Sequence, residues 1–412
     1  MGETKLDVKK TLLLSFGFFA SSIAWSIYNS FVPQILEGFI QSTTLIGFIM
    51  TIDNIFGLVF QPLFGRWSDQ TRTRFGRRMP YIFVGIPVCA VAFTLIPMMG
   101  SIWSLMAVLV VFTFVMSAWR SPVVSLMPDI TPGHLRSQAN GVVNLMGGVG
   151  SLLAFLGGGF LFKLGGFPLP FLMSAVLMLG ALAVLALFVR EPKEAYEPEK
   201  QAEKTPLNLT RGEKKSLLLI LLGVFFWFTG YNAIETFFTL YATNTLGMDV
   251  GSAAMTLAIF SLTFLVFAVP SGYIGATLGR RKTILIGLIG TTALFIPLIF
   301  LSNIWVTRIC LFAGGLFWAC VNINSLPMVV RLSGEEKIGT FIGYYYFFSF
   351  ASQIISPILF GFIRDLVGHY RVLFLYACVA FVIALACLAF VRHGEDEPES
   401  TTAAEVLDGM GD

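Results

Sequence analysis

The sequence contains little charge: Asp, Glu, Lys and Arg make up only 12% of its 412 residues. A soluble domain carries about 25% charged residues, so these side chains are too few to solvate a globule of this size. Histidine is also scarce, with three residues, and no Asp-Asp-x-x-Asp motif occurs. A membrane-embedded transferase needs such a metal-binding or His-based site. The sequence therefore disfavours an enzyme and predicts neither a metal nor a cofactor.

Paired cysteines and basic stripes are lacking as well. The five cysteines lie singly inside apolar runs, where a free thiol behaves as a small buried hydrophobe. Basic residues are concentrated in particular loops, and no basic stripe with interleaved aromatics occurs outside them, so we expect no nucleic-acid partner. Apolar residues instead make up 56% of the chain, and the mean hydropathy is +0.80. They form long blocks, so we expect an all-α integral membrane protein surrounded by the lipid bilayer.

A window of about 19 residues finds twelve apolar blocks long enough to cross a bilayer as helices. They lie near residues 11–35, 43–65, 79–99, 103–126, 137–162, 168–189, 215–242, 250–275, 282–301, 304–329, 338–363 and 370–391. Short loops join most of these blocks, so helices that are neighbours in sequence are expected to pack antiparallel.

Basic residues gather in alternate loops between these blocks. One loop has five arginines between positions 66 and 78, and a later one has Arg280, Arg281 and Lys282, whereas the loop 37–43 has no Lys or Arg. Because Lys and Arg concentrate in cytoplasmic loops, we predict that both termini are cytoplasmic and that the protein spans the cell membrane many times.

A charged, Pro-containing stretch interrupts the helical pattern after residue 190 and cannot bury an apolar core. We interpret residues 191–214 as a cytoplasmic linker between two six-helix bundles, 1–190 and 215–391. The acidic tail, 392–412, is expected to be disordered and cytoplasmic.

The two bundles echo each other in sequence. Residues 65–78, GRWSDQTRTRFGRR, are echoed by 272–281, GYIGATLGRR, at an offset of 207 residues (272 − 65). Residues 159–164, GFLFKL, are echoed by 361–366, GFIRDL, at an offset of 202 residues (361 − 159). Both offsets are close to half the chain. They predict two parallel repeats of six helices with a substrate site between them.

The Gly-x-x-x-Asp pattern that begins at Gly65, with Gly76-Arg77-Arg78 after it, resembles the signature loop of the major facilitator superfamily. Here the segment 70–75 lengthens the usual spacing, and Pro80-Tyr81 follows. This version is similar to the sucrose carriers and the glycoside–pentoside–hexuronide:cation symporters. The resemblance implies the major facilitator fold and sugar transport by alternating access, and we expect a monomer.

The loop also suggests a gate. Gly65 lets two helix ends approach closely, and Asp69 can accept hydrogen bonds at the N-terminus of a neighbouring helix. The arginines can pair with carboxylates of the facing half or with lipid headgroups. The predicted gating residues are Gly65, Asp69, Arg77, Arg78, Arg280 and Arg281. The alternative is a solvated loop that only sets the topology.

Asp53 stands about ten residues into its apolar block, near the membrane midplane. A carboxylate there costs about 2.5–3.5 kcal/mol on insertion scales, so it should face a water-filled cavity. Gly57 and Gln61 follow on the same helix face. Because burial favours the neutral form of a carboxyl group, Asp53 suits proton binding and release. The alternative is a structural Asp satisfied by Asn54 or a neighbouring hydroxyl.

Glu235 and Arg120 are two further candidates inside the membrane. Glu235, counted in the outer third of the block 215–242, is a second proton-coupling candidate, although a carboxylate costs less there. Arg120 precedes Pro122, which suggests a locally opened helix whose freed carbonyls face a cavity. The alternative for Arg120 is a side chain that snorkels to the headgroups.

Other polar and aromatic residues recur at helical spacing, which puts them on common helix faces. The predicted substrate-binding residues are Trp25, Asn29, Gln61, Arg120, Tyr231, Asn232, Trp318, Asn322, Tyr345 and Gln353. Aromatic rings beside hydrogen-bonding groups suit a sugar, whose C–H faces stack while its hydroxyls bond. Taken singly, each residue is also explained as a helix–helix contact or an interface aromatic.

Some residues depart from the family that the loop resembles. Gln61 stands where those symporters carry a sodium-site carboxylate, Arg120 stands where melibiose-type carriers have a sugar-contacting Asp, and Val124 replaces an Arg of the sucrose carriers. We therefore expect protons rather than sodium as the coupling ion, and a sugar other than sucrose. The predicted function is a proton-coupled sugar symporter. A uniporter or a drug:proton antiporter of the same fold is the alternative, although Gly147–Gly150 lacks the Pro of the antiporter signature.

Overall fold

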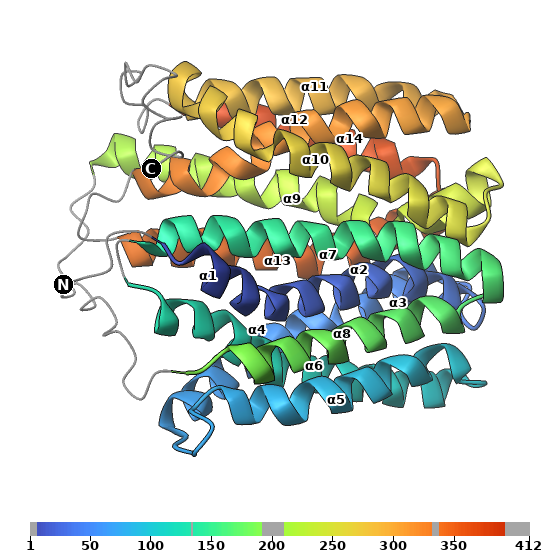
Figure 1. Ribbon diagram of the computed structural model, residues 1–412. Helices are drawn as coiled ribbons and strands as arrows, with labels where there is room; N and C mark the ends of the chain where they lie inside the picture. The colour runs from blue at the N-terminus through green and yellow to red at the C-terminus, as the bar shows by residue number, and fades with distance from the viewer. Residues whose placement is uncertain (1–5, 133–134, 192–209, 332–337, 392–412) are drawn as a thin grey trace. The chain divides into compact units, whose positions relative to one another are not determined.

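The computed structural model describes residues 6–132, 135–191, 210–331 and 338–391. Its helices are α1 (Val8–Leu14), α2 (Phe16–Glu37), α3 (Thr43–Met50), α4 (Ile52–Gln70), α5 (Met79–Leu95), the 3-10 turn η1 (Ile96–Met98), α6 (Ile102–Ile130), α7 (Arg136–Gly165), α8 (Pro168–Phe188), α9 (Arg211–Leu246), α10 (Val250–Leu278), α11 (Arg280–Phe300), α12 (Ile304–Arg331), α13 (Ile338–Val367) and α14 (Val372–Ala389). Figure 1 labels them along the chain.

Twelve helical segments within the described residues are long and apolar enough to cross a membrane. Three of these spans consist of two elements each. The first span is α1 with α2, the second is α3 with α4, and the third is α5 with η1. No β-strand occurs in these residues; the only extended pairing there is an isolated bridge between Thr73 and Gly76. The prediction of an all-α protein with twelve spans is therefore confirmed.

The second span is interrupted at Thr51, which the apolar pattern did not signal. Thr51 lies between α3 and α4, and its hydroxyl donates to the carbonyl of Phe48 at 2.8 Å. A threonine that bonds back to the preceding turn competes with the helical ladder and bends the chain. The break puts Asp53 in the first turn of α4.

Packing divides the chain into two compact units. The first contains Met1–Gln201, Ala233–Ser261 and Ile354–Leu373, and the second contains Ala202–Asn232, Leu262–Gln353 and Phe374–Asp412. The first unit thus includes one end of α9, α10 and α13 together with helices α1 to α8. The predicted linker and tail fall largely on residues outside the described part, so the domain boundaries remain a prediction.

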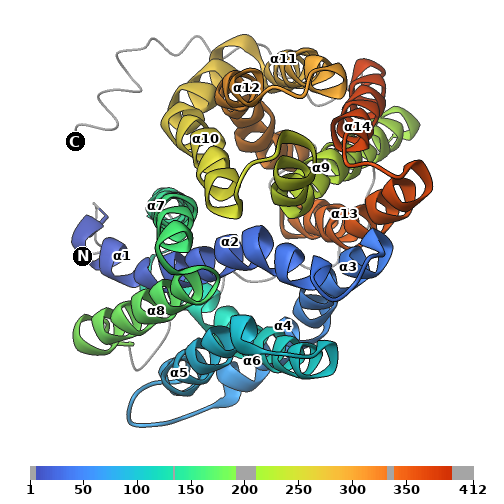
Figure 2. The same ribbon diagram turned by 90° about the vertical axis from the view of Figure 1, so that its right-hand side faces the viewer.

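In the first unit, α2 packs against α7 and α8, while α6 packs against α4 and α5 (Figure 2). Glycine allows a close approach of two of these helices: a Cβ on Gly85 of α5 would lie 2.5 Å from the Cβ of Trp119 on α6. Three phenylalanine rings pack together in this unit. The ring centroid of Phe93 lies 4.8 Å from that of Phe112 and 4.8 Å from that of Phe171.

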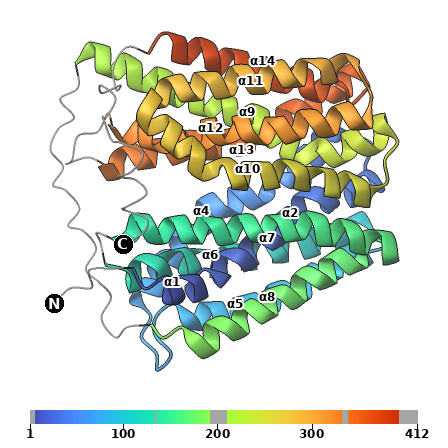
Figure 3. The same cartoon turned by 45° about the horizontal axis from the view of Figure 1, so that its top comes forward.

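In the second unit, α11 and α12 lie side by side (Figure 3). Gly287 and Gly290 of α11 face Phe317 of α12, and a Cβ on Gly287 would lie 2.6 Å from the Phe317 carbonyl. As in the first unit, small residues bring two helix backbones together, which is how helices associate where lipid is as apolar as the side chains.

Candidate functional site

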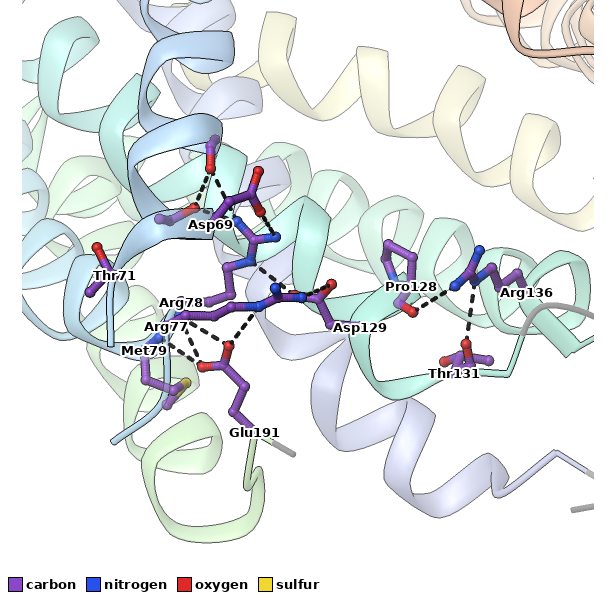
Figure 4. Close-up of polar contacts among 12 residues, drawn as sticks. Asp69, Thr71, Arg77, Arg78, Met79, Pro128, Asp129, Thr131, Arg136 and Glu191 are labelled. Atoms are coloured by element: carbon purple, nitrogen blue, oxygen red, sulfur yellow. Dashed lines mark hydrogen bonds and ion pairs between the residues drawn. The ribbon is translucent and has the colours of Figure 1, made fainter. Parts of the chain in front are cut away.

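The arginine-rich loop between α4 and α5 folds back onto its own half of the chain (Figure 4). Gly76 adopts a positive φ of 107°, a conformation that side chains other than glycine rarely tolerate, and its amide bonds to Thr73. A Cβ there would also collide with the side chain of Glu191. This turn directs Arg77 and Arg78 toward the ends of α6 and α8.

Arg78 is the centre of a buried charge cluster. Its side chain is only 5% exposed, and its Nε donates to Asp129 at 2.9 Å. Its terminal nitrogens bond to Asp69, to the hydroxyl of Ser68 and, at 3.2 Å, to the carbonyl of Gly65. The guanidinium thus joins the end of α4 to the end of α6.

Glu191 completes the cluster from beyond the end of α8. Its carboxylate accepts the backbone N–H of Arg78 at 2.9 Å and that of Met79 at 3.4 Å, so it stabilises the positive N-terminus of α5. Arg77 lies between the two acids, 2.7 Å from Asp129 and 3.6 Å from Glu191. We name Asp69, Arg77, Arg78, Asp129 and Glu191 the loop cluster.

The loop cluster differs from the sequence hypothesis in its partners. The hypothesis placed Asp69 at a helix N-terminus, whereas Glu191 takes that position and Asp69 binds the Arg78 side chain. The carboxylates shown with the arginines all belong to the N-terminal half rather than the facing half. Sequence reasoning missed Asp129 and Glu191, although each is an acid directly after the apolar block of a helix that ends beside the loop.

Gly65 has the close packing expected of it, because a Cβ at this position would lie 3.0 Å from the hydroxyl of Ser121 on α6. The echoed loop in the second unit is built differently. Arg281 donates to the carbonyls of Leu388 at 3.0 Å and Ala389 at 2.9 Å, which caps the C-terminus of α14. The gating roles of Gly65, Asp69, Arg77, Arg78, Arg280 and Arg281 remain predictions.

Two carboxylates of the first unit lie far from the ends of their membrane spans. Asp53 is 10 residues from Thr43, the start of its span, and Glu235 is 11 residues from Leu246, the end of its span. Glu235 is deeper than its sequence position suggested, because α9 continues four residues beyond the predicted end at 242. Each carboxylate is thus about 15 Å from the nearer end of its membrane span.

Asp53 is acted on electrostatically by Arg120 and by Glu235, and we name these three residues the membrane charges. Asp53 also accepts a hydrogen bond from Asn54 at 2.9 Å, and Asn29 of α2 donates to Glu235 at 3.4 Å. The predicted residues Asn29, Asp53, Arg120 and Glu235 therefore belong to one site on α2, α4, α6 and α9.

Arg120 lies within an unbroken helix. α6 continues through Pro122 to Ile130, so the local opening expected at Pro122 is wrong. Arg120 is 10 residues from Ile130, about 15 Å along the helix. At that depth the guanidinium is far from the headgroups, which favours the cavity interpretation over snorkelling.

Tyr28 is a residue of this site that sequence reasoning missed. It is fully buried, the charge of Asp53 acts on it, and its ring stacks on Phe112 with centroids 5.5 Å apart. Its hydroxyl and the indole N–H of Trp25 have no hydrogen-bond partner among the described residues. Its position three residues after Trp25, on the same face, was the available signal.

The remaining candidates are described unit by unit, since Gln61 lies in the first unit and the others lie in the second. Gln61 is half-buried on α4 and lies against Gly57. In the second unit, Tyr231 and Trp318 stack in parallel with centroids 4.6 Å apart, while Asn322 and Gln353 are half-buried. The other two join helices: Asn232 donates to Ser352 at 3.2 Å, and the Tyr345 hydroxyl lies 2.9 Å from that of Ser325.

At the end of the first unit away from the loop cluster, helices from both sequence halves meet. Asp365 of α13 accepts the backbone N–H groups of Thr43 and Thr44 at 2.9 Å each and the hydroxyl of Ser42 at 2.8 Å. It therefore caps the N-terminus of α3 from the other half of the chain. We name this contact the outer cap.

A second contact lies beside the outer cap. Burial raises the pKa of the Tyr370 phenol, which stays protonated and donates to Glu37 at 3.0 Å. Asn244 of α9 donates to the same carboxylate at 3.0 Å. The hydrogen bonds from Tyr370 and Asn244 to Glu37 both join α2 to the C-terminal half of the chain. They hold the helices of the two sequence halves together at this end of the first unit.

Replacing Gly361 by Ala tests the close packing beside the outer cap. A Cβ at Gly361 would lie 2.5 Å from the backbone carbonyl of Thr43, which cannot move aside easily. We expect the free energy of unfolding to fall by about 1–3 kcal/mol. Gly343→Ala, on the same helix with nothing within 4 Å, is the control. It should raise stability by up to about 1 kcal/mol, so equal shifts in a thermal denaturation would contradict the packing argument.

Replacing Asp365 by Ala tests the outer cap itself. Loss of a charged cap costs about 0.5–2 kcal/mol, and only in the state in which α3 and α13 touch. We expect the open population at this end to rise by about 2-fold to 30-fold, since 1.4 kcal/mol is tenfold. Pulsed electron spin resonance between labels at Leu45 and Leu366, both exposed, measures it.

Asp7→Ala is the matched control, because Asp7 caps its own helix by accepting from Lys10 at 2.9 Å. Its loss should not change the distance distribution. If Asp365→Ala also leaves that distribution unchanged, the outer cap does not hold this end closed.

The model of the Major Facilitator Superfamily matches residues 14–262 and 220–408. The chain therefore belongs to this superfamily of membrane transporters. It is a multi-pass membrane protein that carries small molecules and is not an enzyme.

Curated relatives of this chain have different substrates in their names. The class E tetracycline resistance protein of Escherichia coli is 23% identical, covering 91% of this chain and 93% of that protein. The hexuronate transporter of Bacillus subtilis is 23% identical over 90% and 91% of the two chains. The sucrose transport protein SUC3 of Arabidopsis thaliana is 26% identical, but over 36% of this chain and 29% of its own.

Solved structures agree on the fold. A bacterial homologue of the lysosomal transporter Spinster, inward-facing and occupied, has a TM-score of 0.71 at 14% identity, covering 95% of each chain. The nucleoside transporter NupG has a TM-score of 0.71 at 12% identity, covering 93% of this chain and all of that one. At these identities the likeness concerns the fold alone.

Proposed function

We propose that this protein is a proton-coupled carrier of a sugar or glycoside. The observation that carries the proposal is the set of membrane charges, because Arg120 and Glu235 act on Asp53 and each of the three lies about 15 Å from the nearer end of its span. Groups so costly to insert in a membrane mark a transport pathway or a proton relay.

Charge balance explains how a proton would be used. With both carboxylates ionised, the site has two negative charges against Arg120, and binding one proton leaves it balanced. A balanced site costs less to enclose away from water, so protonation would favour the closed carrier that can turn over. One charge moved across 100 mV supplies about 2.3 kcal/mol.

Hydrogen-bond chemistry supports a sugar as the solute. The buried N–H of Trp25 and the hydroxyl of Tyr28 have no hydrogen-bond partner within the described part of the chain, and a polyol offers oxygens to them. The carboxylates would accept from sugar hydroxyls, and the aromatic rings of α2 and α6 would cover C–H faces. A hexuronate would in addition place its carboxylate on Arg120.

A drug:proton antiporter is the second candidate. It is favoured by the similarity to a tetracycline resistance protein over 91% of this chain. An antiporter would use the same carboxylates, but the proton and the drug would compete for the site and cross the membrane in opposite directions. A uniporter would leave the cost of the two carboxylates unexplained.

The loop cluster would serve as a latch in either case. Arg78 joins the ends of α4 and α6, and Glu191 lies where the chain leaves the first bundle. We place this end of the bundle and both termini in the cytoplasm, on the strength of the arginines.

Proteoliposomes distinguish the two functions. Purified protein is reconstituted with inside-alkaline or inside-acid pH gradients, and the uptake of disaccharides, a hexuronate and tetracycline is measured. Sugar uptake driven only by the inside-alkaline gradient supports the proposal. Tetracycline uptake driven by the inside-acid gradient, without sugar uptake, would establish the antiporter instead. Sodium without a pH gradient should drive neither.

A further inference from the structure

An apolar groove crosses the surface of the first unit between α4, α5 and α6. It encloses about 480 Å³, and its walls include Phe64, Tyr81, Val84, Val88 and Phe114. Val84 is 67% exposed and Val88 is 44% exposed, so the groove opens outward. The face belongs to a membrane-spanning bundle and is lined by carbon, so it suits an acyl chain rather than a polar solute.

The groove has the length of one leaflet. On α5 it extends from Pro80, at the start of the helix, to Val88, which is eight residues or about 12 Å farther along. Half of a hydrocarbon core of about 30 Å is about 15 Å. The groove therefore begins at the membrane surface beside the arginine-rich loop and ends near the midplane.

Polar and basic groups are concentrated at the surface end only. The hydroxyls of Thr71 and Tyr81 lie 2.9 Å apart there, and Figure 4 shows Thr71 just beyond the end of α4. Arg72 donates to the Thr71 carbonyl at 3.0 Å, which brings a guanidinium to this end. Arg74 is exposed and lies over Phe75, 4.7 Å from the ring centroid.

These two arginines differ from Arg77 and Arg78. Among the described residues, no carboxylate pairs with Arg72 or Arg74, whereas the other two are held in the loop cluster. Exposed guanidinium groups at headgroup level attract anionic lipids. The basic groups at one end of the groove match the charged headgroup of a phospholipid, and the apolar walls along the rest match its acyl chain.

The geometry points to a binding site for one anionic phospholipid. One acyl chain occupies the groove between α4, α5 and α6, and the headgroup phosphate binds Arg72 and Arg74. The glycerol esters lie at the level of the Thr71 and Tyr81 hydroxyls. The site is separate from the membrane charges and does not depend on the identity of the transported solute.

Native mass spectrometry of the purified full-length protein tests this site. Phosphatidylglycerol and phosphatidylcholine with the same acyl chains are titrated onto delipidated protein. We expect one phosphatidylglycerol to bind at least 10-fold more tightly than phosphatidylcholine. Val88→Phe, which fills the groove, should weaken this binding at least 10-fold. Val91→Phe is the matched control, since Val91 is 61% exposed on the same helix outside the groove.

The headgroup contact is tested separately. The double variant Arg72→Gln and Arg74→Gln should lose the preference for phosphatidylglycerol while still binding either lipid weakly. Arg308→Gln is its control, because Arg308 lies over Trp305 near the start of α12, away from the groove. Folding of each variant is checked by its thermal transition. Equal binding by the Val88→Phe and Val91→Phe proteins overturns the groove site, and an unchanged lipid preference in the double variant overturns the anionic headgroup.

Discussion

Replacing Asp53 by Asn is expected to abolish uphill transport while leaving downhill exchange intact. One proton moved across 100 mV supports an accumulation ratio of roughly 50-fold, from about 2.3 kcal/mol. An amide keeps the size of the side chain and its contact with Asn54 but cannot take up a proton. The accumulation ratio in proteoliposomes should therefore fall from tens to about one.

Counterflow of labelled solute provides the necessary internal comparison, because it needs solute binding and turnover but no net proton movement. Asp249→Asn is the control variant, since Asp249 is an exposed carboxylate outside the membrane spans. Glu235→Gln tests the partner carboxylate in the same assay. If the Asp53→Asn protein still accumulates its solute against a gradient, Asp53 is not the proton carrier.

Replacing Arg78 by Gln is expected to destabilise the protein by about 3–5 kcal/mol, the cost of removing one partner from a buried ion pair. The substitution leaves Asp129, whose side chain is 12% exposed, with a weaker set of donors. It also removes the bond to the Gly65 carbonyl. Unfolding of the purified protein in increasing denaturing detergent measures the loss.

Arg66→Gln is the control for the loss of one loop charge, because Arg66 is exposed and should change stability by less than about 1 kcal/mol. The combined Arg78→Gln and Asp129→Asn protein should recover part of the loss, since no buried charge is then left unpaired. Equal effects of Arg66→Gln and Arg78→Gln would contradict the buried cluster.

Local patterns were sufficient to predict the class of protein. Twelve apolar blocks predicted twelve spans, because every backbone N–H and C=O group of a segment in lipid must form a hydrogen bond within the protein. A helix forms these bonds among the residues of its own block. The loop motif from Gly65 to Arg78 indicated the superfamily. It could be recognised in the sequence because Gly76 and its neighbours form the turn from local contacts alone.

The candidate site could be predicted only in part. Asp53 and Glu235 were found because a carboxylate inside an apolar block is conspicuous in sequence. That Asn29, Arg120 and Tyr28 share a site with them depends on how four helices pack. Asn232 and Tyr345 each bond to a residue of a neighbouring helix, a contact that the sequence pattern does not specify, and their role in solute binding stays a prediction.

The sequence by itself determined the membrane environment, the number of spans and the superfamily, because each follows from short-range hydrophobicity and turn chemistry. Only the tertiary structure decided which residues pair with the loop arginines and which residue caps a helix end. Asp129 and Glu191 hold the arginine-rich loop, and Asp365 caps a helix more than 300 residues away in the chain. Such pairs form because helix ends and buried charges must find partners wherever packing brings them, and periodicity within one helix contains no information about which partner that will be.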